Sequence, residues 1–99
     1  MPAAPKSIRH VDRELLDRVA ARPCVLCQGQ PSDPSHIRSR GAGGPDKEFN
    51  VAPHCRGHHQ LWHSLGQKTF LKKFPVMRLW LALRGWDTDK MTHPELDGS

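Results

Sequence analysis

The sequence predicts a small α+β domain, in which a short β-hairpin and a helix are flanked by further helices. Three observations lead to this fold class. Two short segments of strand-like character, residues 34–37 and 49–53, lie on either side of a Gly-rich loop. Apolar residues at helical spacing come before and after them. Close pairs of Cys and His residues around the hairpin suggest a metal staple, which suits a 99-residue chain with only 36% hydrophobic residues.

The first predicted helix covers residues 12–21 and follows residues 1–7, which we expect to form a flexible tail. Asp12 is the expected N-cap of this helix. Pro23 ends it. One face of the helix is apolar and should enter the core; it carries Leu15, Leu16 and Val19. We expect residues 8–86 to form a single domain.

The hairpin and its helix come next. The two strands are joined by the loop RSRGAGGPDKE, which is rich in Gly and charge. A helix is expected from Arg56 to Leu65, and Gly66 is suited to close it. The Trp residue of this helix, Trp62, is expected in the core.

Two more helical segments are predicted within residues 67–86. Residues 69–74 form a short one, and Pro75 suits the first position of the next. Apolar residues of that helix recur at i, i+3, i+4 and i+7, which predicts that they pack over the core: Val76, Leu79, Trp80 and Leu83. Gly85 is the expected stop, and Trp86 should pack rather than stack on bases. Residues 87–99 are polar and are expected to form a loose tail, with His93, like His10, in solvent.

The composition favours an anionic partner. The formal net charge is +5 and the isoelectric point is near 9.6, so nucleic acid is the expected partner and a merely solvated basic surface is the alternative. No segment approaches the roughly 18 apolar residues of a membrane span, and MPAAPKSIRH lacks the apolar run of a secretory signal. We therefore expect a reducing, cytoplasmic setting, where Cys pairs bind metal more often than they form disulfides.

The Cys residues predict a structural zinc site. Cys24 and Cys27 form a CxxC, and Cys55 and His58 form a second half-site 28 residues later. Three Cys and one His make the tetrahedral ligand set that Zn²⁺ favours in closed structural sites, which leave no position open for chemistry. The alternatives are three unrelated buried thiols or a redox CxxC, and the surrounding sequence lacks the βαβ pattern of the redox proteins.

A second metal site is predicted on the same helix. His63 lies four positions after His59, so both point to one face of the helix, whereas His58 is turned by about 100° from His59. His58 therefore belongs with Cys55, and the other two belong to a different site. Two imidazoles leave positions open for substrate and water. The alternative interpretation is a polar helix face.

Residues 22–66, about half of the chain, closely resemble the HNH nucleases. The resemblance is carried by Ser35-His36-Ile37, a Gly-rich loop, the segment from Asn50 to Cys55, and the three histidines that follow. These nucleases have a His on a first strand, an Asn on a second and a Cys- and His-containing sequence that opens a helix, together called a ββα-metal or His-Me finger core. The chain is most similar in style to small zinc-ribbon HNH proteins of bacteria and phages, and the paired helix histidines are similar to those of the colicin nucleases.

The resemblance implies a metal-dependent endonuclease that hydrolyses DNA to a 5′-phosphate and a 3′-hydroxyl. In this role His36 is the general base, and Asn50 bonds to its ring and orients it. His59 and His63 hold a divalent catalytic metal, such as Mg²⁺, Mn²⁺, Ni²⁺ or Zn²⁺. One active site is expected to nick one strand, so a double-strand cut needs a homodimer or two visits.

Three further positions complete the predicted site. Arg38 and Arg40 can clamp a phosphate, or can lie in a solvated loop. The family often places Asp or His before the base as a third metal ligand, but this chain has Ser35, a poor ligand. Replacement ligands are sought among Asp33, Asp46 and Glu48, and His54 is expected to be structural. Ser35 is the reason for the alternative function, a catalytically weak or inactive zinc-stabilised module that binds nucleic acid.

Overall fold

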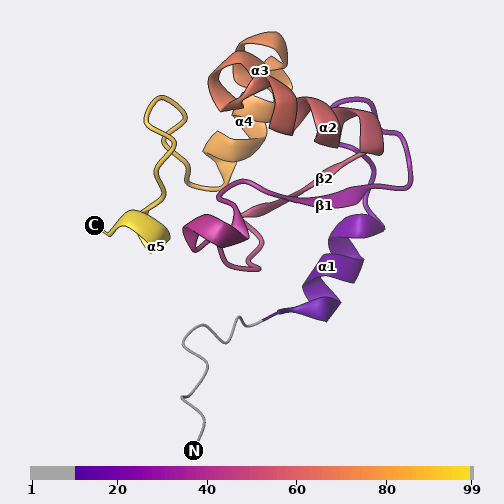
Figure 1. The fold of residues 1–99 in the computed structure, drawn as a ribbon, viewed down its shortest axis with the longest axis horizontal. Helices are drawn as coiled ribbons and strands as arrows, with labels where there is room; N and C mark the ends of the chain where they lie inside the picture. Colours follow the sequence, from indigo (N-terminus) through magenta and orange to yellow (C-terminus); the bar gives the residue numbers. More distant parts are fainter. Residues whose placement is uncertain (1–10, 99) are drawn as a thin grey trace, which may run out of the picture.

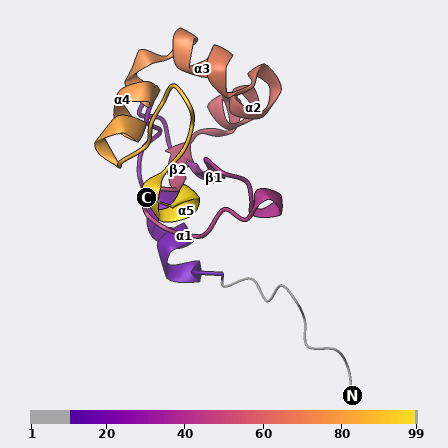
Figure 2. The same ribbon diagram turned by 90° about the vertical axis from the view of Figure 1, so that its left-hand side faces the viewer.

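The computed structural model describes residues 11–98, so the predicted tail over residues 1–7 and His10 lie outside the described part. A two-stranded antiparallel sheet, β1 (Asp33–His36) and β2 (Val51–His54), lies between α1 (Arg13–Ala20) on one side and α2 (Arg56–Leu65) on the other (Figure 1). α3 (Gln67–Lys73) and α4 (Pro75–Leu83) continue from α2, and α5 (Pro94–Asp97) returns to the loop end of the hairpin (Figures 1 and 2). The α+β class is confirmed.

α1 forms as the sequence predicts. The Asp12 carboxylate accepts a hydrogen bond from the backbone N–H of Leu15 at 2.9 Å, which caps the helix. Leu15, Leu16 and Val19 are buried and pack with Val51 of β2. The apolar stripe of the helix therefore attaches it to the underside of the hairpin.

The hairpin has a definite register, in which Asp33 faces His54 and His36 faces Val51. Residues 49 and 50, predicted in the second strand, lie in a turn instead, because the N–H of Asn50 bonds to the Lys47 carbonyl at 2.8 Å. The carbonyl of Asn50 still accepts from the N–H of Ile37 at 2.8 Å, which extends the pairing beyond β1.

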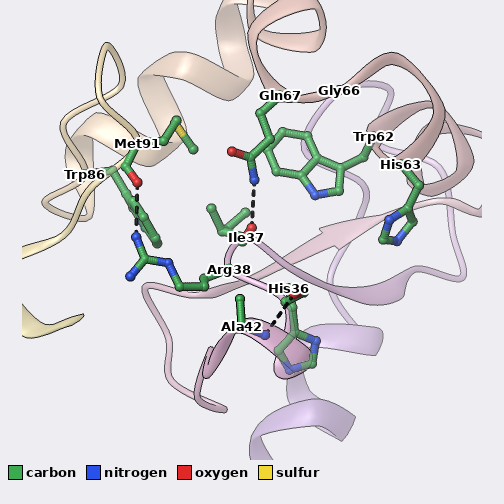
Figure 3. Close-up of a pocket in the computed structure, with 11 residues that line it drawn as sticks. His36, Ile37, Arg38, Ala42, Trp62, His63, Gly66, Gln67, Trp86 and Met91 are labelled. Carbon is green, nitrogen blue, oxygen red and sulfur yellow. Dashed lines mark hydrogen bonds between the residues drawn. The ribbon is translucent and has the colours of Figure 1, made fainter. Parts of the chain in front are cut away.

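α2 begins and ends where the sequence predicts, and Gly66 follows it with a φ of 82°, a conformation that favours Gly. α3 starts at Gln67, two residues earlier than predicted. The side chain of Gln67 donates to the carbonyl of Ile37 at 2.8 Å and so fastens α3 to the end of β1 (Figure 3). No helix within residues 11–98 is both long and apolar enough to cross a bilayer.

The main core lies between the sheet and α2–α4. Its fully buried members are Ile37, Ala52, Trp62, Phe70, Leu71, Met77, Leu81 and Trp86. Trp62 meets Phe70 edge to face, with ring centroids 5.1 Å apart. The prediction that Trp62 and Trp86 pack in the core is confirmed.

α4 turns a different face to the core than predicted. Met77 and Leu81 are fully buried, whereas Val76, Leu79 and Leu83 are 47%, 57% and 74% exposed. The predicted stripe was therefore wrong for these three residues, whereas its fourth member, Trp80, is partly buried and packs against the core. The helix is apolar on two faces, and spacing alone cannot say which one meets α3.

The segment after Trp86 is not a loose tail. Asp87 pairs with Thr92 in an antiparallel bridge, and α5 follows. His93, predicted in solvent, is 5% exposed and stacks on Phe49 with ring centroids 3.9 Å apart. Its Nε2–H donates to the Arg84 carbonyl at 2.8 Å. Nδ1 of His93 accepts from the N–H of Glu95 at 3.1 Å, and the ring also contacts Trp86. Because both ring nitrogens are bonded, this polar residue can be buried.

Leu81→Ala should lower the free energy of unfolding by about 2–5 kcal/mol, because it leaves a cavity in the core. Leu83→Ala, on the same helix and exposed, is the matched control and should change it by less than about 0.5 kcal/mol. Urea unfolding of zinc-saturated protein measures both. Equal effects of the two substitutions would mean that α4 faces the core differently.

Candidate functional site

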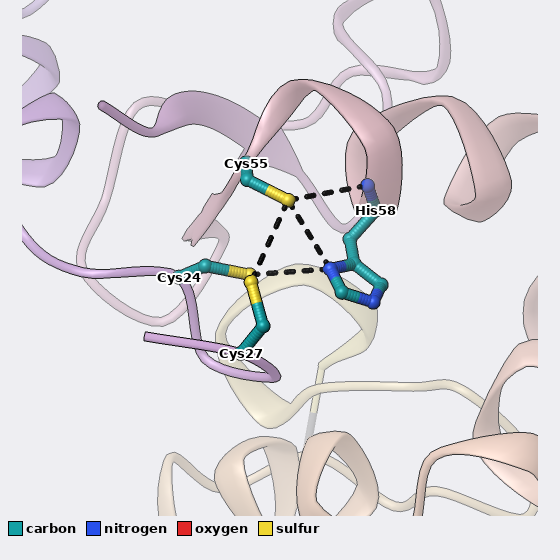
Figure 4. Close-up of side chains that lie close together, drawn as sticks. All are labelled: Cys24, Cys27, Cys55 and His58. Carbon is teal, nitrogen blue, oxygen red and sulfur yellow. Dashed lines mark hydrogen bonds between the residues drawn. The ribbon is translucent and has the colours of Figure 1, made fainter. Parts of the chain in front are cut away.

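Four side chains gather above the end of the hairpin: Cys24, Cys27, Cys55 and His58 (Figure 4). One ligand atom from each lies within 4.8 Å of all the others, and the three thiols form no disulfide. The first two come from the turn after α1 and the last two from the start of α2. The predicted Cys₃His group is therefore assembled, and it can hold a metal ion such as zinc.

Backbone hydrogen bonds shape the turn that carries Cys24 and Cys27. The N–H of Cys24 bonds to the Gly29 carbonyl at 3.0 Å, and the N–H of Gln28 returns to the Cys24 carbonyl at 2.9 Å. The N–H of Leu26 points at Cys24 Sγ at 3.4 Å. Cys55 Sγ likewise accepts from the N–H of His58 at 3.5 Å and caps α2. Such N–H groups stabilise thiolates, the form that binds metal.

The spacing of the ligand atoms fits a tetrahedral zinc ion. With Zn–S bonds of about 2.3 Å and Zn–N bonds of about 2.1 Å, sulfur atoms lie about 3.8 Å apart and sulfur and nitrogen about 3.6 Å apart. Sγ of Cys27 and Sγ of Cys55 are 3.8 Å apart. His58 Nδ1 lies 3.6 Å from Cys24 Sγ and 3.2 Å from Cys55 Sγ.

The protonation of Cys24 agrees with this fit. Burial acts to raise the pKa of the thiol, but backbone N–H groups, including that of Leu26, outweigh burial and lower it. A lowered pKa makes the Cys24 thiolate, the form that binds a cation, easier to reach. Because redox CxxC motifs also contain thiols of lowered pKa, the metal assignment depends on the four-residue cluster that includes Cys55 and His58.

His59 and His63 face each other on the side of α2 away from the cysteines. Their Nε2 atoms are 3.1 Å apart, within the roughly 3.0–3.4 Å expected for two nitrogens about 2.1 Å from one cation at octahedral or tetrahedral angles. Nδ1 of His59 lies 3.2 Å from the Asp33 carboxylate. Because a carboxylate accepts, Nδ1 carries the proton, and the Nε2 lone pair of His59 points toward Nε2 of His63. The separation of His58 from this pair is as predicted.

His36 is paired with Asp46, which was predicted only as a possible metal ligand. Its Nε2 lies 2.7 Å from the carboxylate of Asp46, whose side chain is 2% exposed. Burial acts to raise the pKa of Asp46, but the hydrogen bond from His36, the N–H of Asp12 and the charge of Arg40 outweigh it and lower that pKa. The ionised Asp46 carboxylate accepts the Nε2 proton, so the neutral tautomer of His36 that fits this contact has its lone pair on Nδ1.

Asn50 does not bond to His36, so the predicted orienting role was wrong. Its buried side chain accepts from the N–H of Arg38 at 2.8 Å and donates to the carbonyls of Arg38 and Pro45 at 3.0 and 2.9 Å. A Cβ on Gly44 would lie 1.7 Å from the Arg38 carbonyl oxygen. Asn50 and Gly44 therefore shape the loop that carries Asp46 to His36.

The third metal position is not supplied by Ser35. Its side chain is fully buried and its Oγ has no hydrogen-bond partner. Of the three replacements considered, Asp33 and Asp46 bond to histidines, and Glu48 bonds to Arg22 on the surface at 3.0 Å. Within residues 11–98, Cys24, Cys27, Cys55 and His58 form the single cluster of three or more metal-ligating side chains.

Arg38 and Arg40 both contact carboxylates of the protein itself. Arg38 makes a two-pronged contact with Asp97 of α5 at 2.7 and 3.0 Å and lies over the ring of Trp86. Arg40 lies 3.5 Å from Asp46 and retains a 41% exposed side chain. The free Arg38 clamp that the sequence predicts is not found, because the C-terminal segment supplies a carboxylate.

The predicted base and the histidine pair line one hollow of about 380 Å³, together with Pro34, Ser39 and Arg40. A neighbouring hollow of about 390 Å³ runs from His36 and His63 toward Trp86 and Arg38 (Figure 3). The arrangement offers a basic imidazole, two further imidazole ligands and a guanidinium around one open space.

Asp33 and Asp46 each orient a histidine, a role that differs from the metal-ligand role considered for them. Asp46 precedes the second strand in a loop, and no local pattern links it to a ring ten residues earlier.

His54 is fully buried, and burial lowers its pKa to about 4. Its Nε2 contacts the Met77 sulfur at 3.4 Å. His54 is therefore neutral near pH 7 and packs in the core, as expected of a structural residue.

No protein-family model, curated protein or solved structure matches this chain.

The purified protein should hold one tightly bound zinc per chain. His58→Ala should lose it, whereas His63→Ala, on the same helix, should keep it. With zinc about 1,000-fold above its Kd, binding stabilises the fold by about 4 kcal/mol, so chelation should lower the unfolding temperature. Zinc content by mass spectrometry and thermal unfolding measure this. Equal zinc loss in both variants would contradict the division of the histidines.

Proposed function

We propose that this protein is a metal-dependent endonuclease that hydrolyses DNA phosphodiesters, with β1, β2 and α2 as an HNH-type ββα-metal core. One observation carries the proposal. The His36–Asp46 pair and the His59–His63 pair open onto the same hollow. A base and a candidate metal-binding pair beside one cavity are the two parts that hydrolysis of a phosphodiester requires.

The histidines and aspartates around the hollow have distinct roles in the proposed hydrolysis. Nδ1 of His36 takes a proton from water as the water oxygen bonds to phosphorus, while Asp46 holds the ring and stabilises its charged form. The bond between phosphorus and the 3′ oxygen breaks, and the leaving 3′ oxygen takes a proton from solvent water, which leaves a 5′-phosphate and a 3′-hydroxyl. His59 and His63 would hold a divalent cation, which neutralises the phosphate and stabilises the leaving oxygen. Asp33 keeps the Nε2 lone pair of His59 available.

The charge of the chain supports DNA as the substrate. A net charge of +5 favours a polyanion through counterion release. One base and one histidine pair serve one phosphodiester, so a single chain nicks one strand.

A second function is favoured by a specific observation, the missing third ligand beside His59 and His63. A module that binds DNA without cutting it would keep the Cys₃His group and the positive charge.

Supercoiled plasmid with Mg²⁺, Mn²⁺ or Ni²⁺ separates the two functions. Wild type should nick the plasmid, and His36→Ala should reduce the rate by about 100-fold or more, the usual contribution of a general base. Asp46→Asn should lower the rate while leaving DNA affinity unchanged. Circular dichroism and zinc content must match wild type in both variants.

Two outcomes would contradict the nuclease. Nicking that survives in His36→Ala would identify a contaminant or another base. A gel shift without cleavage in any of the three metals would favour the DNA-binding module.

A further inference from the structure

The face of α4 that carries Val76, Leu79 and Leu83 has no described partner. These three side chains are about half to three quarters exposed, although they recur at the spacing of a buried stripe. Scattered apolar residues are common on protein surfaces, but a contiguous row on one helix marks a binding face.

The row lines a groove of about 390 Å³, together with Trp80, Pro23 and Val25. Pro23 and Val25 belong to the turn that carries Cys24 and Cys27. The N–H of Val25 bonds to the Pro53 carbonyl at 3.0 Å, which fastens this turn to β2. The groove shares no lining residue with the hollow beside His36.

The charge of the groove is one-sided. Arg22 and Arg84 line it, and no Asp or Glu does. Arg22 is paired with Glu48. Arg84 lies 3.8 Å above the Trp80 ring and bonds to the Trp80 carbonyl, and it forms no ion pair with a carboxylate in residues 11–98. Burial and the charge of Arg22 lower the pKa of Arg84, and the charge of Glu48 acts to raise it. A further carboxylate beside Arg84 would stabilise its charged form.

We infer that this groove docks a segment of a partner protein that presents apolar side chains to Val76, Leu79 and Leu83 and a carboxylate to Arg84. Charge complementarity selects this occupant. A second copy of the chain is disfavoured, because a two-fold contact places the same patch on both sides and brings both sets of arginines together. The inference is independent of the nuclease proposal.

A random twelve-residue peptide library displayed on phage and selected on zinc-loaded protein tests the inference. Selected peptides should combine apolar residues with Asp or Glu. Synthesised, they should bind wild type at least about tenfold more tightly than Leu79→Ser/Leu83→Ser, a loss of about 1.4 kcal/mol. Arg84→Gln should also weaken binding, whereas Lys72→Gln, which removes the same charge outside the groove, should not.

Because the substituted leucines are exposed, the double variant should keep the zinc content and plasmid nicking of wild type. Three results would overturn the inference. The first is a selection that returns no peptide, or only peptides without an acid. The second is a set of peptides that bind the double variant as well as wild type. The third is a wild-type dimer in sedimentation that the double variant abolishes, which would make a second copy the occupant.

Discussion

The convergence of Cys24, Cys27, Cys55 and His58 is the constraint on which the rest of this small structure depends. It joins the turn after α1 to the first turn of α2, across 28 residues that contain the whole hairpin. A metal ion held by these four residues would close this long loop and so stabilise the folded chain without a larger core. It also fixes the start and the rotation of α2.

The rotation of α2 determines the second site. Because His58 is committed to the cysteines, the next residue must point about 100° away, and the helix delivers His59 and His63 to the other side. Asp33 at the start of β1 meets His59 there. The same strand ends at His36, so sheet and helix together place three imidazoles around one hollow. The structural group and the proposed catalytic group are therefore consequences of one helix placement.

Local chemistry explains what the sequence could predict. The cap at Asp12, the bounds of α2 and the Cys₃His set depend on neighbouring residues or on a spacing that is typical of metal sites. The exposed stripe of α4 and the burial of His93 could not be predicted in this way. They depend on which face of α4 packs on the core and on the packing of His93 against the distant Phe49. Asn50 was assigned to the wrong partner for the same reason, because its amide reaches the backbone of the loop while Asp46 reaches the ring.

X-ray absorption at the zinc edge of the purified protein tests whether Cys24, Cys27, Cys55 and His58 bind one zinc ion. We expect three sulfur atoms at about 2.3 Å and one imidazole nitrogen at about 2.0–2.1 Å around a single zinc. The His58→Ala protein should lose the imidazole scattering, and the His63→Ala protein should retain it. A zinc ion bound by imidazoles and oxygen in the wild-type protein, with fewer than three sulfur neighbours, would contradict the account.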